Sequence, residues 1–380
     1  MASGQGYALI GPAGREDADL YLGKDTIFPH PTAFRAPGTA LWGLLAGADP
    51  SWFKLINVAL GAGTCALIFL ILESTGAALS AGLLWAFYPS AVFATTLYGS
   101  EALYVFFLTL TAWLLSRLPS GRASGRQLAF IGLCVAWSCL IRPPAIVLLA
   151  PVLAALWNKS RKETLRRGAL VAGFVALGIL PWTARNWVLF HRFVPIATSH
   201  GIAFGLRTAY HRPNAVPRTE AGDEPSLSDQ GWNNGVENLK ETFLAGPVVI
   251  ARSVADNLDR AFGSDSDVIQ WATLTAYDPT RRPQPDENRA ISANALAGWL
   301  LFNHFFYAGL LMLALAGLAF SAASHFLSDR GVWFLLFHLL LMCGMLILVP
   351  GLNRYHFSMM VPVVMLAGLG IDGLGKRLFE

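Results

Sequence analysis

Long apolar stretches without Asp, Glu, Lys or Arg alternate with short charged segments along the chain. A helix that crosses a bilayer needs roughly 20 mainly apolar residues, with about 17 as the lower limit. Because lipid offers no hydrogen-bond partners, the backbone groups of such stretches must pair within a helix. The pattern predicts nine transmembrane helices, at about 52–72, 77–97, 99–117, 127–142, 143–158, 168–189, 297–320, 331–350 and 354–374.

The polar segments between these stretches divide the chain into four regions. Residues 1–51 are predicted to form an extracytoplasmic segment with an apolar half-helix near its end, and 52–189 hold the first six transmembrane helices. Residues 190–296 form a second extracytoplasmic region, with an amphipathic helix expected at about 236–262, and 297–380 hold the last three transmembrane helices. The predicted fold class is therefore an all-α polytopic membrane protein with extracytoplasmic loops and interfacial helices.

The composition supports a membrane protein. Only 14% of the 380 residues are charged, against roughly 25% in an average soluble protein. Hydrophobic residues make up 54% of the chain, and the mean hydropathy is +0.48. These values exclude a disordered chain, an ordinary cytosolic enzyme and a basic nucleic-acid-binding domain. The expected surroundings are a lipid bilayer, and no nucleic-acid partner is expected.

Basic residues in the short connections predict the orientation in the membrane, because cytoplasmic loops carry an excess of Lys and Arg. Three groups of basic residues fall on the same side of a nine-helix arrangement: Arg117, Arg122 and Arg126; Lys159, Arg161, Lys162, Arg166 and Arg167; and Lys376 with Arg377. That side is predicted to be cytoplasmic. The regions 1–51 and 190–296 then face outward, towards the periplasm if the chain lies in an inner cell membrane.

A second set of polar residues gathers at the predicted outer edges of the helices. Its members are Arg35, Glu101, Arg142, Arg185 with Asn186, and Arg354 with Tyr355 and His356. Guanidinium groups bind phosphate oxygens through two parallel hydrogen bonds. An arginine-rich rim beside lipid therefore indicates a site for a lipid-linked phosphate. The alternative is that each of these side chains only anchors a helix end at the membrane surface.

Several motifs in this order resemble a known family. The run Pro181-Trp182-Thr183-Ala184-Arg185-Asn186, followed by Phe190–Thr198, resembles a signature of bacterial membrane glycosyltransferases of the GT-C superfamily. This superfamily includes aminoarabinose-transferase-like and protein-O-mannosyltransferase-like enzymes. Weaker echoes of the same pattern occur at Gly4–Tyr7, Pro31–Gly38, Ser100-Glu101, Arg142-Pro143 and Asn353–Tyr355.

The resemblance implies an extracytoplasmic active site, a polyprenyl-phosphate-linked sugar as donor, and inverting transfer to a lipid, glycan or protein acceptor. It assigns the contact with the donor phosphate best to Arg35, with Arg142, Arg185 and Arg354 as further candidates. Glu101 is a candidate to orient one of these arginines. Asn186 and Tyr355 are candidate supporting residues.

The general base is the point at which the sequence departs from the family. The acceptor hydroxyl must lose a proton as it attacks, and a carboxylate normally accepts that proton. In relatives an acidic residue follows a first transmembrane helix, and both would precede Met1 here, so the resemblance implies that this sequence lacks that helix. Asp19 and Asp25 are the general-base candidates, with a solvated acidic loop as the alternative. No metal or other cofactor is expected, because no cluster of His, Asp or Glu has ligand spacing.

Two other functional classes stay open. The missing helix and acid are compatible with a non-catalytic or truncated membrane subunit of the same fold. A transporter is disfavoured, because transporters commonly show internal repeats and a site at the membrane midplane. The sequence shows no repeat, and its charged residues gather at one membrane face.

Overall fold

The computed structural model describes residues 33, 35–45, 50–97, 99–119, 123–157, 160–208, 224–262, 265–273, 290–321, 329–348 and 353–379. Within these ranges all regular secondary structure is helical. The predicted all-α polytopic membrane fold is confirmed. The predicted general-base candidates Asp19 and Asp25 lie outside the described residues.

The described helices fall into an N-terminal and a C-terminal part of the chain. The N-terminal part contains α2 (Gly38–Leu45), α3 (Pro50–Ile71), α4 (Thr75–Phe87), α5 (Pro89–Ala94), α6 (Glu101–Ser116), α7 (Gly125–Ile141), η1 (Pro143–Leu148), α8 (Leu149–Ala155) and α9 (Arg161–Phe190). The C-terminal part contains α10 (Ser199–Thr208), α11 (Glu224–Leu244), α12 (Pro247–Phe262), α13 (Asp267–Ala272), α14 (Ala293–Ser321), α15 (Arg330–Leu348), η4 (Asn353–Met359) and α16 (Met360–Phe379).

Four helical segments are long and apolar enough to cross a membrane: Ser51–Ile71, Arg161–Phe190, Ala293–Phe320 and His356–Leu378. Shorter apolar helices lie at the other predicted spans, at Thr75–Phe87, Glu101–Ser116, Gly125–Ile141, Pro143–Ala155 and Arg330–Met345. Helical segments therefore stand where the apolar pattern places them. Because several of them are short for a crossing, the number of nine spans stays a prediction.

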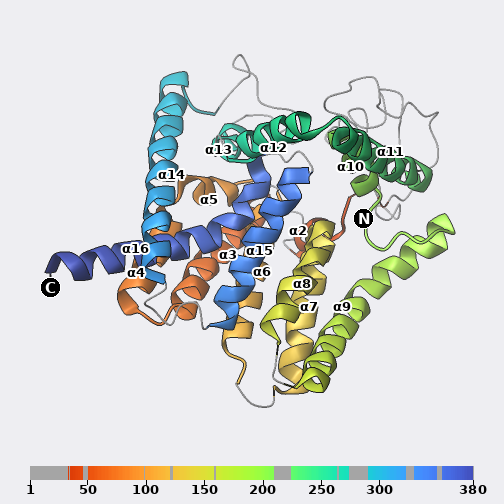
Figure 1. Ribbon diagram of the computed structural model, residues 1–380, viewed down its shortest axis with the longest axis horizontal. Coiled ribbons are helices and arrows are strands. Elements are labelled where there is room, and N and C mark those ends of the chain that lie inside the picture. Colours follow the sequence, from red (N-terminus) through yellow and green to blue (C-terminus); the bar gives the residue numbers. More distant parts are fainter. Residues whose placement is uncertain are drawn as a thin grey trace.

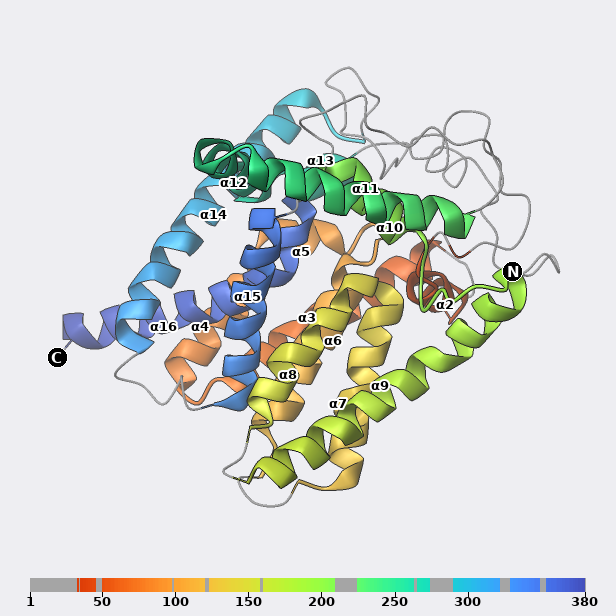
Figure 2. The same ribbon diagram turned by 45° about the vertical axis from the view of Figure 1, so that its right-hand side comes forward.

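Helices α10, α11, α12 and α13 lie across one end of the helical bundle (Figures 1 and 2). We call this end the capped end. Helix α12 packs against α15 and η4, and α13 packs against α5, α14 and η4. The region between α9 and α14, predicted as one extracytoplasmic segment, thus provides the cover of the bundle.

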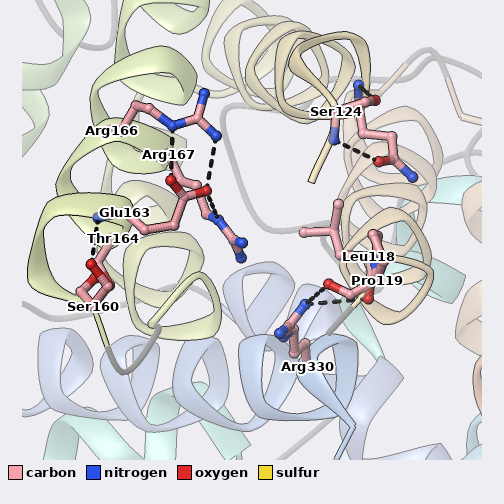
Figure 3. A network of polar contacts seen from close by, with 10 residues as sticks. Leu118, Pro119, Ser124, Ser160, Glu163, Thr164, Arg166, Arg167 and Arg330 are labelled. Carbon is pink, nitrogen blue, oxygen red and sulfur yellow. Dashed lines mark hydrogen bonds and ion pairs between the residues drawn. The ribbon is translucent and has the colours of Figure 1, made fainter. Parts of the chain in front are cut away.

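At the opposite, uncapped end of the bundle, arginine side chains bind the end of a neighbouring helix or an acidic side chain of their own helix. The guanidinium of Arg330 donates to the carbonyls of Leu118 and Pro119, each at 3.2 Å. At the start of α9, the Glu163 carboxylate bridges Arg166 and Arg167 (Figure 3). The start of α9, with two of the basic residues that we predict to be cytoplasmic, Arg166 and Arg167, therefore lies at the end away from the cover.

Glycines allow close contact between the two long C-terminal helices α14 and α16. A Cβ atom on Gly317 would lie 1.8 Å from the carbonyl oxygen of Leu366, and one on Gly370 would lie 2.2 Å from that of Leu313. Small residues let helix backbones approach closely inside membranes, where packing drives association. These two glycines set the spacing of the helix pair.

Two predicted helices are interrupted, in both cases before a proline. The amphipathic helix expected at 236–262 is two helices, because α11 ends at Leu244, Gly246 has a φ of 98° and α12 begins at Pro247. The helix expected at 77–97 is divided into α4 and α5 at Tyr88, whose ψ is 111°. A proline disfavours helical geometry at the residue before it, which explains both interruptions.

Candidate functional site

Arg142 stands at the corner between α7 and η1. Its backbone is extended, with φ −136° and ψ 101°, because the following Pro143 disfavours the helical region. The Nε of Arg142 donates to the Ser100 hydroxyl at 2.8 Å, and its Nη2 forms an ion pair with the Glu101 carboxylate. The side chain of Glu101 is only 6% exposed, whereas that of Arg142 is 16% exposed. A buried acid thus holds a guanidinium that still reaches the molecular surface.

The Pro181–Asn186 motif lies near the C-terminal end of α9, and the loop that follows the helix folds back onto it. Asn186 is completely buried, and its side-chain amide donates to the Val194 carbonyl at 3.0 Å. The indole of Trp182 donates to the Ile196 carbonyl at 2.7 Å. The Cζ of Arg185 lies 4.6 Å from the centroid of the Trp182 ring. Its Nη1 donates to the Asn186 side-chain oxygen at 2.8 Å. The motif therefore fixes both the loop and the Arg185 guanidinium.

The segment that carries Arg35 lies between the ends of α9 and α7. The backbone N–H of Thr198, in the loop after α9, donates to the Ala33 carbonyl at 3.0 Å. Gly38, at the start of α2, packs so closely on α7 that a Cβ there would lie 2.7 Å from the Leu140 carbonyl oxygen. Arg35, between these two contacts, is half-buried. The fold thus brings the elements carrying Arg35, Arg142 and Arg185 together.

The backbone of Arg354 and Tyr355 lies in η4, which packs against α6 and the cover helix α12. The side chains of these two residues lie outside what the structure describes. Among the described residues, no group of three or more His, Cys, Asp or Glu side chains is placed to hold a metal ion.

A buried polar cluster at the capped end escaped the sequence analysis. Asp265, between α12 and α13, accepts hydrogen bonds from the Tyr88 hydroxyl and from Ser90, whose Oγ lies 2.7 Å from Oδ2. The Nε2 of His356 lies 2.9 Å from the other carboxylate oxygen of Asp265. His356 stood out in the sequence as a polar residue at a helix edge. Asp265 had no such signal, because it lies in a polar stretch with many other acids.

The chemistry of the capped end suits an anionic ligand. Guanidinium groups recognise phosphate, and a partner that fixes their position in advance makes such recognition less costly in entropy. Glu101 fixes Arg142 in this way, and Trp182 with Asn186 fixes Arg185.

Comparison with known proteins gives the family context of this geometry. Residues 40–184 match the family of dolichyl-phosphate-mannose-protein mannosyltransferases. No curated protein matches the chain. Of the solved structures, an oligosaccharyltransferase of Archaeoglobus fulgidus tethered with an acceptor peptide superposes with a TM-score of 0.50 and 14% identity, covering 91% of this chain and 42% of that one.

Two further structures resemble the chain more distantly. Archaeal oligosaccharyltransferase AglB from Archaeoglobus fulgidus, in complex with an inhibitory peptide and a dolichol-phosphate, has a TM-score of 0.47 at 15% identity, over 92% of this chain and 43% of that one. ArnT from Cupriavidus metallidurans, bound to undecaprenyl phosphate, has a TM-score of 0.37 at 14% identity, over 98% of this chain and 75% of that one.

The chain spans less than half of the length of the oligosaccharyltransferases that it matches. The agreement with the structure tethered with an acceptor peptide is therefore an agreement in fold over the aligned part of that chain. The family match over residues 40–184 and the fold shared with the oligosaccharyltransferase tethered with an acceptor peptide agree with the resemblance predicted from the sequence.

Proposed function

We propose that the chain is an integral membrane glycosyltransferase that transfers a sugar from a polyprenyl-phosphate donor to an acceptor at the capped end. The observation that carries this proposal is the pairing of Arg142 with the buried Glu101, at the end of the bundle where the segments of Arg35 and Arg185 meet. The acceptor is a lipid, a glycan or a protein, and transfer inverts the configuration at the sugar carbon, as the resemblance implies.

The proposed reaction explains why several guanidinium groups are needed. As the sugar leaves its phosphate, negative charge builds up on the phosphate oxygens, and cations held in place beforehand stabilise that charge. Arg142 is held by Ser100 and Glu101, so little reorganisation is required when charge develops. Arg35, Arg185 and Arg354 complete the proposed phosphate site, with Asn186 and Tyr355 as supporting residues. Asp19 and Asp25 stay the proposed general-base candidates.

The family match supports the class of donor. Dolichyl-phosphate-mannose, named in the description of the matched family, is a sugar on a polyprenyl phosphate. The matched segment, residues 40–184, includes both Glu101 and Arg142. The basic start of α9 supports an outward-facing capped end, because it lies at the other end of the bundle and an excess of Lys and Arg is typical of the cytoplasmic side.

A binding experiment in detergent tests the phosphate site. The purified protein is titrated with a polyprenyl phosphate, and Arg35→Ala and Arg185→Ala are compared with the exposed Arg161→Ala, which removes the same charge at the uncapped end. Loss of one charge-assisted contact is expected to weaken binding about tenfold or more. Unchanged binding in both capped-end variants would contradict the proposal.

A transfer experiment separates the enzyme from the non-catalytic subunit. The protein is incubated with polyprenyl-phosphate-linked mannose carrying a radioactive sugar, in the presence of lipid and glycan extracts and peptide acceptors. Label that moves to an acceptor, and that is reduced by Arg142→Lys, supports a transferase, because a lysine keeps the charge of Arg142 but not its planar fork. Binding of the donor without any transfer supports the non-catalytic alternative.

A further inference from the structure

The cluster around Asp265 joins four separate parts of the fold at the capped end. Tyr88 and Ser90 come from the junction of α4 and α5, Asn303 from α14, and His356 from η4. Asp265 itself lies between the cover helices α12 and α13 and is 6% exposed. We call these five residues the Asp265 cluster.

Both carboxylate oxygens and the backbone carbonyl of Asp265 have partners in this cluster. Its carboxylate accepts from Tyr88, lies 2.7 Å from the Ser90 hydroxyl and lies 2.9 Å from the His356 Nε2. Its backbone carbonyl accepts from the Asn303 side-chain amide at 2.8 Å. A buried carboxylate is costly unless it is hydrogen-bonded in this way. Removing its charge should therefore disturb all four elements together.

His356 is the member of the cluster that connects it with the proposed donor site. An ionised carboxylate only accepts hydrogen bonds, so it pairs with the tautomer of His356 that carries its proton on Nε2. The centroid of the imidazole also lies 5.8 Å from that of the Phe262 ring and 5.7 Å from that of the Tyr307 ring. Its side chain is 1% exposed, so it is out of reach of a substrate. Any effect of His356 on function is therefore exerted through the position of η4.

The helix η4 needs such an external contact. A 3-10 helix has poorer hydrogen-bond geometry than an α-helix and is stable only in short pieces. It carries Arg354 two residues before His356 and packs against α6, the helix that begins with Glu101. The orientation of η4 therefore decides where the Arg354 backbone stands relative to α6, whose Glu101 pairs with Arg142.

We propose that Asp265 and His356 are positioning residues for the donor site, because their contact fixes η4 and with it Arg354. The role in donor binding rests on the proposed function. The contact between Asp265 and His356 can be tested without assuming that function. The same contact joins the cover to the bundle, since Asp265 follows α12 and His356 belongs to η4. The contact between Asp265 and His356 thus holds both the cover and the helix that carries Arg354.

Hydrogen exchange tests whether the contact fixes η4. The variants are Asp265→Asn, His356→Leu and His356→Gln, with Asp259→Asn on the exposed side of α12 as the charge-matched control. Backbone amides of residues 353–359 should exchange about tenfold faster in Asp265→Asn and His356→Leu. His356→Gln should stay close to the wild type, because its amide nitrogen can donate from the position of Nε2. Equal exchange in all four variants would overturn the inference.

Donor binding tests whether the fixed helix serves Arg354. The affinity for a polyprenyl phosphate is measured in Asp265→Asn, in Arg354→Ala and in the double variant. Each single change should weaken binding about tenfold, and the double variant should bind no more weakly than Arg354→Ala, because the two residues act in series. Additive losses would overturn the positioning role.

The two experiments separate failure of this inference from failure of the proposed function. Weaker binding in Arg354→Ala with normal binding in Asp265→Asn would overturn the positioning role alone. Normal binding in Arg35→Ala, Arg185→Ala and Arg354→Ala would overturn the proposed function, whatever the exchange rates show. If Asp265→Asn does not fold, Ser90→Ala removes one donor with little change in volume, and smaller losses in the same direction are expected.

Discussion

The backbone N–H of Thr198 donates a hydrogen bond of 3.0 Å to the carbonyl of Ala33. Through this bond the loop that follows α9 holds the segment that carries Arg35. The loop is itself held by Asn186, whose side chain lies beside Arg185. Two arginines from distant parts of the sequence therefore depend on one set of contacts around the loop after α9.

Replacing Asn186 by Ala should release the loop after α9. The buried amide of Asn186 satisfies the Val194 carbonyl, and without it that carbonyl loses its partner. An unsatisfied buried polar group costs about 1–3 kcal/mol. We expect a lower thermal midpoint in detergent, together with weaker binding of a polyprenyl phosphate because Arg185 loses its neighbour. Thr183→Ala on the same helix removes the 2.8 Å bond from a partly exposed hydroxyl to the Pro195 carbonyl, with the 3.3 Å bond to the Ile179 carbonyl of its own helix, and should have a smaller effect.

Replacing Gly38 by Ala should separate α2 from α7. The new Cβ would lie 2.7 Å from a backbone oxygen of Leu140, which cannot turn away as a side-chain end can. Overpacking of this kind typically costs about 1–3 kcal/mol. The control is Gly43→Ala in the same helix, where the nearest atoms are those of Phe53 at 3.9 Å. Donor binding should fall in the first variant and stay normal in the second. Equal behaviour of the two would contradict the close contact.

The pair of Glu101 and Arg142 should show strong energetic coupling. Glu101→Gln leaves a partly buried guanidinium without its counter-charge, and breaking a buried pair costs about 3–5 kcal/mol. The double variant Glu101→Gln/Arg142→Gln should lose less stability than the sum of the single changes. A thiol-reactive dye that reports the exposure of the buried Cys134 and Cys139 on unfolding can measure these differences. Strict additivity would show that the two side chains do not interact.

The close contact of α14 and α16 gives a test of the fold that is independent of function. Gly317→Ala would place a Cβ 1.8 Å from the Leu366 carbonyl oxygen and should destabilise the protein strongly. Gly309 lies in the same helix, and nothing stands within 4 Å of a Cβ built there. Gly309→Ala should therefore be neutral or slightly stabilising, because Ala favours a helix by about 1 kcal/mol over Gly. Thermal unfolding of both variants decides the point.

Accessibility labelling tests the orientation of the two ends. In a background without the four native cysteines, single cysteines at Arg35 and Arg185 should react with an impermeant reagent added outside intact cells. A cysteine at Arg161, at the uncapped end, should react only after the membrane is opened. Labelling of Arg35 and Arg185 from opposite sides would exclude a common phosphate site.

The positions of the membrane helices could be predicted from the sequence because the signal is local. The apolar run predicted at 52–72 is α3 at Pro50–Ile71, and that at 297–320 is α14 at Ala293–Ser321. Lipid excludes charged residues from such runs, so each run marks its own limits. The same local logic placed Arg142 at a sharp corner, because two prolines follow it. The arginines at helix edges were found in this way, one by one.

The contacts between those helices were decided only by the tertiary structure. Asp265 and His356 are 91 residues apart, and nothing near either residue in the sequence names the other as its partner. Glu101 and Arg142 were both candidates, but which arginine the acid would hold depended on the close approach of the start of α6 and the end of α7. Burial and pairing of polar groups depend on which helix ends meet in space. The sequence pattern of a single chain does not give the distances between those ends.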